Sequence, residues 1–151
     1  MSKHQINWTL KIFEILTPHE LYAILRLRSE VFVVEQNCVF LDMDNKDQFC
    51  YHLLGWANND LVACTRLIAP GKVYDLMSIG RVVSSPAYRG TGIGRELMEV
   101  SIQKCYGLFG KAPIKIGAQL YLKKFYESLG FEQTSDIYLE DDIEHIEMIK
   151  P

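Results

Sequence analysis

The stretch SSPAYRGTGIG, Ser84 to Gly94, lies near the middle of the chain and decides how the rest is interpreted. Glycines alternate behind Arg89, at positions 90, 92 and 94. Glycine loses more conformational freedom on folding than any other residue, so this density indicates a backbone that some group approaches closely. An apolar, β-prone segment (77–85) precedes the stretch, and apolar residues recur at helical spacing from Ile93 onward. The stretch is therefore predicted to join a strand to a helix.

Two common nucleotide-binding motifs do not fit these glycines. A P-loop needs a lysine and a serine or threonine after its last glycine, whereas Arg95 and Glu96 follow Gly94. A dinucleotide fingerprint needs the spacing GxGxxG after the first strand, whereas this spacing is GxGxG after a late strand. What remains is an anion cradle, in which backbone N–H groups and a helix N-terminus hold a pyrophosphate beside Arg89. The alternative is a tight turn that binds no ligand.

Composition limits the class of protein. The 151 residues are 48% hydrophobic with a formal net charge of −3, which predicts one domain over residues 1–151 and disfavours nucleic-acid binding. No apolar run reaches the ~18–20 residues that span a bilayer, and the first residues lack a signal-peptide core. The cysteines form no CxxC pair and the histidines are scattered, so we expect reduced thiols, no metal site and a cytoplasmic location.

Periodicity predicts an α/β domain built on a mixed sheet rather than a purely parallel one. Thr17 and Glu20 form a capping box that opens a helix running to Phe32. The segment 120–131 is predicted to form a helix, with Gly130 positioned as its left-handed C-terminal cap. Strands are expected over 8–16, 52–57, 61–69, 77–85 and 113–118 and in the tail 137–149, with a helix from residue 93. The acidic loop 42–48 lacks the spacing of an EF-hand and is expected to be solvated.

Two segments together resemble a known family. The stretch VVSSPAYRGTGIG resembles motif A of the GNAT superfamily of N-acetyltransferases. Downstream, QLYLKKFYESLGF resembles that family's N-x-x-A-x-x-x-Y-x-x-x-G-F motif: Tyr126 and the final Gly-Phe match, while Gln119 and Leu122 depart from it. LRSEVFVVEQ and the tail EDDIEH are similar to the ElaA family of GNAT-like proteins, although Asp142 and Glu144 stand where that family has glycine and proline.

The resemblance implies the GNAT acyl-CoA N-acyltransferase fold, a central mixed β-sheet flanked by helices. It implies acetyl-CoA as co-substrate without a metal, a small-molecule or peptide amine as acceptor, and often a homodimer, with neither nucleic acid nor membrane as partner. A β-bulge would free backbone groups for the pantetheine arm and supply one N–H to the oxyanion. The residues implied to bind coenzyme A are Val82, Val83, Ser84, Arg89, Gly90, Thr91, Gly92, Ile93, Gly94 and Gln119.

Catalytic roles follow partly from the resemblance. Tyr126 is the candidate general acid for the coenzyme A thiolate, and a core tyrosine is the alternative. The strand before the glycine loop has no carboxylate, so the candidate bases are Glu30, Glu35, His52 and His145. An ordered water chain, or an amine that arrives neutral, would need no protein base. An acyl-CoA-binding sensor without catalysis is the alternative function, and a structural domain that has lost the cofactor is a third.

Overall fold

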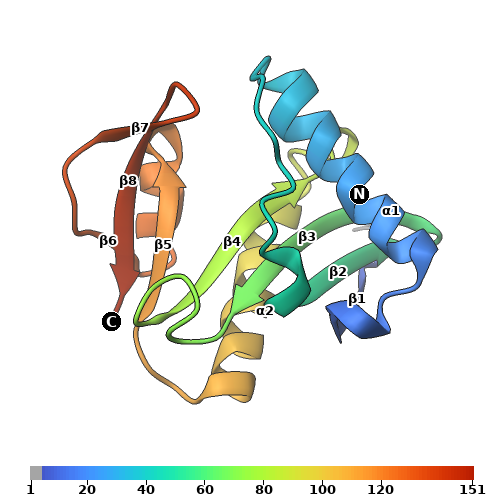
Figure 1. Ribbon diagram of the computed structural model, residues 1–151, viewed down its shortest axis with the longest axis horizontal. Coiled ribbons are helices and arrows are strands. Elements are labelled where there is room, and N and C mark those ends of the chain that lie inside the picture. The colour runs from blue at the N-terminus through green and yellow to red at the C-terminus, as the bar shows by residue number, and fades with distance from the viewer. Residues whose placement is uncertain (1–4) are drawn as a thin grey trace.

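The computed structural model describes residues 5–151, whose strands form one mixed sheet in the order β1-β2-β3-β4-β5-β8-β6, with β7 paired to β8 (Figure 1). β4 and β5 are parallel, and the other paired strands are antiparallel. The α/β class with a mixed sheet is therefore confirmed. The strands are β1 (Asn7–Ile12), β2 (Tyr51–Ala57), β3 (Asp60–Ile68), β4 (Met77–Ser84), β5 (Ile114–Gln119), β6 (Glu132–Gln133), β7 (Tyr138–Glu140) and β8 (Ile143–Lys150).

Helix α1 (Pro18–Arg28) begins at the predicted capping box. Thr17 Oγ1 accepts from the Glu20 N–H at 3.1 Å, and Glu20 Oε1 accepts from the Thr17 N–H at 2.8 Å. Beyond α1 the chain continues as a π-helix (Ser29–Glu35), three residues past the predicted end of the helix. The apolar face of these helices packs with one face of the sheet through Ile24, Leu27, Val31, Leu54, Cys64 and Val83.

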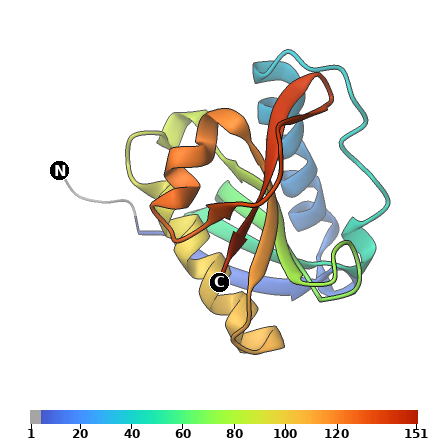
Figure 2. The same cartoon turned by 90° about the vertical axis from the view of Figure 1, so that its left-hand side faces the viewer.

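Helices α2 (Ile93–Phe109) and α3 (Lys123–Glu127) cover the opposite face of the sheet, as Figure 2 shows. The face of α2 carrying Leu97 and Met98 is fully buried. α3 is shorter than the predicted helix because a 3₁₀ turn (Leu120–Leu122) precedes it. Gly130 has a φ of +97°, which confirms the predicted left-handed cap.

The two ends of the chain differ in detail from the prediction. The first strand ends at Ile12, and a 3₁₀ turn (Phe13–Ile15) follows it. The tail forms the hairpin of β7 and β8, whose two-residue turn puts Asp141 and Asp142 at φ values of +51° and +62°. Within residues 5–151, no helix combines the length and apolar character needed to cross a membrane.

The feature that positions the site is the divergence of β4 and β5. These strands pair only at Met77 with Ile114 and at Ser78 with Lys115. Beyond that point they separate, as the two strands do toward the upper end of Figure 1. From Ile79 to Ser84, the edge of β4 that faces β5 therefore has no strand partner among the described residues.

Candidate active site

A cleft of about 680 Å³ occupies the gap between β4 and β5. Residues 79–84 of β4 form one wall, and β5 contributes Ile116, Gly117 and Gln119 to the other. The register of β4 against β3 shifts between Cys64 and Arg66, which leaves two residues of β4 opposite one residue of β3. This is a β-bulge, and it bends β4 away from β5.

The glycine loop lies at one end of this cleft, where it leads into α2. Gly90 and Gly92 have φ values of +80° and +84°, a region that side-chain-bearing residues rarely adopt. A Cβ atom added at Gly90, Gly92 or Gly94 would meet no heavy atom within 4 Å, so packing inside the protein does not require these glycines. The first N–H groups of α2 have no partner inside the helix. The loop thus offers open space beside free N–H donors, which fits an anionic group such as a pyrophosphate.

Arg89 does not extend freely from this loop. Its Nη1 and Nη2 atoms donate to the two carboxylate oxygens of Glu35, both at 2.5 Å. The hydrogen bonds from Arg89 lower the pKa of Glu35, which therefore stays ionised at neutral pH. Glu35, one of the candidate bases, thus forms an ion pair with Arg89, the cation that is predicted to bind coenzyme A.

The segment after α1 also contacts the other side of the cleft. The side-chain amides of Gln36 and Gln119 exchange two hydrogen bonds of 3.3 Å. Cys38 Sγ donates to the carbonyl oxygen of Asp141 at 3.2 Å. Residues 35–38 therefore bridge the β4–α2 loop, the end of β5 and the β7–β8 turn. Sequence reasoning missed Gln36 and Cys38 because their partners lie more than eighty residues away.

Tyr126 lies at the cleft with only 5% of its surface exposed. Its ring packs edge-on against Phe125 and Phe131, at centroid distances of 5.2 and 5.9 Å. Burial raises the pKa of Tyr126, and no hydrogen bond from another described residue offsets this effect. The phenol therefore keeps its proton at neutral pH, as a general acid must.

The remaining candidate bases have different surroundings. His145 lines the cleft, and its Nδ1 lies 2.7 Å from the Ile143 carbonyl oxygen. Because a carbonyl oxygen only accepts, Nδ1 carries a hydrogen, and Nε2 lies 3.6 Å from a carboxylate oxygen of Glu140. Glu30 is absent from the described lining of the cleft and lies 3.9 Å from Arg26 on the exposed side of the helix. His52 is buried away from the cleft, and burial lowers its pKa.

Of the predicted cofactor-binding residues, some line the cleft, whereas the side chains of others contact the rest of the protein. The predicted residues that line the cleft are Val82, Val83, Ser84, Arg89, Gly94 and Gln119. Thr91 instead donates from Oγ1 to the Tyr88 carbonyl oxygen at 2.5 Å, and the Ile93 side chain is buried in the core. Only the backbone of Ile93 is therefore available to a ligand. Sequence reasoning also missed the aromatic residues Phe32, Phe40 and Tyr121 of the cleft.

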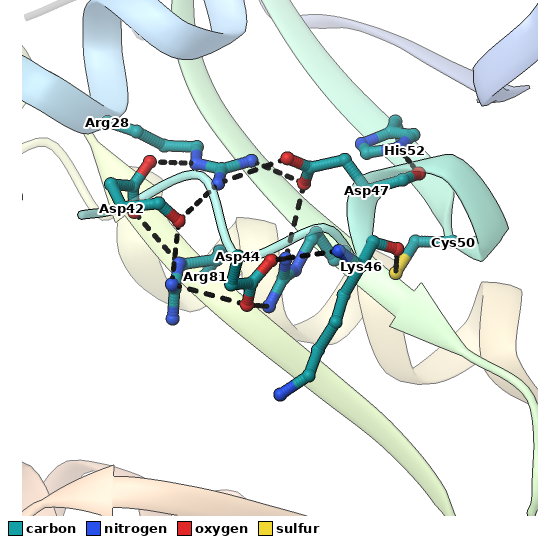
Figure 3. A network of polar contacts seen from close by, with 9 residues as sticks. Arg28, Asp42, Asp44, Lys46, Asp47, Cys50, His52 and Arg81 are labelled. Carbon is teal, nitrogen blue, oxygen red and sulfur yellow. Dashed lines mark hydrogen bonds and ion pairs between the residues drawn. The ribbon is translucent and has the colours of Figure 1, made fainter. Parts of the chain in front are cut away.

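The aspartates of the acidic loop are not solvated, which corrects the sequence prediction. Asp42 and Asp47 are each only 7% exposed. Arg28, which is 1% exposed, donates to Asp42 Oδ2 and Asp47 Oδ1 at 2.7 Å each (Figure 3). Arg66 of β3 donates from Nη1 to Asp44 at 2.7 Å. A buried carboxylate needs such partners, so the loop is held down by arginines from α1 and β3.

Comparisons with known proteins agree with this architecture. A family model described as an acetyltransferase (GNAT) domain matches residues 30–151. Protein ElaA of Escherichia coli is 40% identical over 147 residues, with 96% of each chain covered. The crystal structure of an acyl-CoA N-acyltransferase from Pseudomonas aeruginosa superposes with a TM-score of 0.92 at 42% identity, over 97% of this chain and 100% of that one. The crystal structure of E. coli ElaA gives a TM-score of 0.91 at 38% identity, over the same shares.

Proposed function

Because the chain belongs to the GNAT family of acetyltransferases, and within it to the ElaA proteins, we propose that it transfers an acetyl group from acetyl-CoA to an amine. The observation that carries the proposal is the cleft between β4 and β5, which has an unpaired backbone edge on one wall and a glycine-lined helix N-terminus at its end. When bound, acetyl-CoA supplies an acetyl group activated as a thioester. The acceptor is a small molecule or a peptide with a primary amine.

The glycine loop and β4 perform the binding step in this proposal. The backbone N–H groups of Gly92, Ile93 and Gly94 bind the pyrophosphate, and Arg89 adds a positive charge. Residues 82–84 pair through their backbone with the pantetheine arm, as an additional strand would. One of their N–H groups donates to the carbonyl oxygen as negative charge develops on it.

Two side chains move protons in the proposed reaction. His145 accepts a proton from the amine at Nε2, the ring nitrogen that does not contact the Ile143 carbonyl oxygen. As the new C–N bond forms and the C–S bond breaks, Tyr126 donates its phenolic proton to the leaving sulfur. Burial of Tyr126 keeps that proton in place until it is needed.

The proposal is tested by calorimetric titration of the full chain with acetyl-CoA, followed by a panel of amines with free thiol as the readout. Tyr126→Phe is expected to lower kcat by about a hundredfold or more and to leave the Kd for acetyl-CoA nearly unchanged. Tyr22→Phe is the matched control, because Tyr22 is 73% exposed on α1. Binding without turnover on any amine would replace the proposal by the acyl-CoA sensor, and absence of binding would refute both.

A further inference from the structure

Arg81 has a backbone conformation that is unusual for its residue type. It lies within β4 at the bulge, and its φ is +47°. Among non-glycine residues such angles are uncommon, and Asn and Asp adopt them more readily than arginine does. Outliers of this kind persist only where surrounding contacts hold them in place. The Arg81 side chain makes contacts that can hold this backbone conformation in place.

Two aspartates hold the Arg81 guanidinium from the same side. Nε lies 2.8 Å from Asp42 Oδ1, and Nη2 donates to the Asp42 carbonyl oxygen at 2.8 Å. Nη2 also lies 3.3 Å from Asp44 Oδ2. The Phe40 ring lies on the guanidinium, with its centroid 5.8 Å away. These partners neutralise the cation, so Arg81 is not a free anion-binding group even though it lines the cleft.

The aspartates are themselves fixed by buried arginines. Arg28 binds Asp42, and Arg66 binds Asp44 through both carboxylate oxygens, at 2.7 and 2.9 Å. Arg28 and Arg66 are only 1% and 5% exposed. The network therefore connects α1, β3 and the 42–47 loop to the one residue of β4 that has a left-handed backbone, as the dashed contacts around Arg81 in Figure 3 illustrate.

The bulge decides which N–H groups of β4 face the cleft. The Ser85 N–H donates to the Val62 carbonyl oxygen at 2.7 Å, on the β3 side. Because N–H groups alternate in direction along an extended strand, those of Ser84 and Val82 point to the opposite side, toward the cleft. The extra residue at the bulge reverses this alternation between Gly80 and Val82. A straightened β4 would therefore turn a different set of N–H groups toward the substrate.

We propose that Arg81, clamped by Asp42 and Asp44, is a positioning residue that holds the bulge so that the Val82 N–H faces the thioester carbonyl. This inference rests on the proposed acetyl transfer. Arg81 acts through the backbone next to it, and its side chain is held by Asp42 and Asp44 and not by the glycine loop. Its loss should therefore lower the rate of the chemical step more than it lowers acetyl-CoA affinity.

The decisive variant is Arg81→Gly, because glycine adopts the left-handed backbone readily but cannot reach the aspartates. We expect kcat to fall by about a hundredfold, as for the loss of one oxyanion donor. The Kd for acetyl-CoA should rise by less than about tenfold, because the pantetheine contacts of β4 are weakened while the groups that bind the pyrophosphate are untouched. Millimolar guanidinium ion should restore part of the lost kcat, whereas equal sodium or urea should not. A merely structural role would not lower kcat more than it raises the Kd, and guanidinium ion would not restore kcat.

Two further variants, Arg81→Lys and Arg26→Ala, complete the test. Arg81→Lys retains the charge without the fork of donors, and an intermediate kcat is expected; this variant replaces Arg81→Gly if the latter does not fold. Arg26→Ala removes an arginine that is 73% exposed on α1 and should match the wild type. If the wild type turns over and both Arg81 variants retain its kcat, the positioning role is overturned while the proposed function stands. If the wild type binds no acetyl-CoA, the proposed function fails and this role fails with it.

Discussion

The ion pair between Arg89 and Glu35 predicts that removing an acidic side chain will strengthen coenzyme A binding. In the structure the Nη1 and Nη2 atoms of Arg89 each donate to a carboxylate oxygen of Glu35, at 2.5 Å. A pyrophosphate in the glycine loop must take over that guanidinium, so the free energy of the ion pair is subtracted from the free energy of binding. Glu35→Gln removes the charge with little change in shape, and Arg89 then binds the phosphate without this competition.

The size of the effect follows from the exposure of the pair. The Arg89 and Glu35 side chains are 48% and 37% exposed, so the pair is worth about 0.2–1 kcal/mol. The Kd for coenzyme A should therefore decrease by about 1.4- to 5-fold, toward the larger value because both donors are used. Raising the salt concentration should reduce the difference, because exposed charges are screened.

Calorimetric titration of coenzyme A into wild type, Glu35→Gln and Glu30→Gln measures this effect. Glu30→Gln is the matched control, since it removes the same charge from the same helical segment, but Glu30 pairs with Arg26 and acts on Arg89 only through a weaker coulombic interaction. Weaker binding by Glu35→Gln, or equal tightening in both variants, would refute the competition. A loss of turnover in Glu35→Gln without a change in Kd would instead identify Glu35 as the base in place of His145.

Four other outcomes are expected. Arg28→Met should lower the free energy of unfolding by about 3 kcal/mol in a urea titration, since two buried carboxylates lose a partner but keep other arginines; a loss below about 1 kcal/mol would contradict this. Burial would raise the pKa of Asp44 and Asp47, but hydrogen bonds from Arg66 and Arg28 outweigh burial and lower the pKa of both carboxyls. The stability that these residues contribute should therefore persist above about pH 4 and decline below it, as measured by urea titrations across pH. Gly94→Ala should raise stability by about 0.5 kcal/mol in thermal melts, since its Cβ meets no protein atom, while weakening coenzyme A binding about tenfold; unchanged binding would exclude the loop as the phosphate site. Asp142→Gly relieves a φ of +62° and should stabilise the chain by about 0.5–1 kcal/mol, measured in the same melts, and a lower melting temperature would contradict that.

Local signals predicted most of the fold. The capping box at Thr17, the left-handed Gly130 and the glycine loop before α2 each depend on residues a few positions apart, and each is present as expected. The π-helix after Arg28 has no comparable signal in its sequence and was not foreseen. It carries Glu35 onto Arg89, a contact between residues 54 positions apart.

The acidic loop shows why the rest escaped prediction. Asp42, Asp44 and Asp47 have the local pattern of a solvated turn, and their burial depends on arginines 14 to 39 positions away. A single sequence does not pair such charges, because many arginines are available and only the fold selects among them. The site was predicted where it rests on a loop and its neighbouring strand, and incompletely where distant segments converge on the cleft.

The unpaired edge of β4 has a consequence for how the chain tolerates change. A wall made of backbone groups depends on the path of the chain more than on the identity of the side chains it carries. Replacing Val82 or Val83 by another β-branched residue leaves the N–H and C=O groups where they were. Inserting or deleting one residue between Gly80 and Ser84 would reverse their directions beyond that point. This segment should therefore accept many exchanges of residue type and almost no change of length.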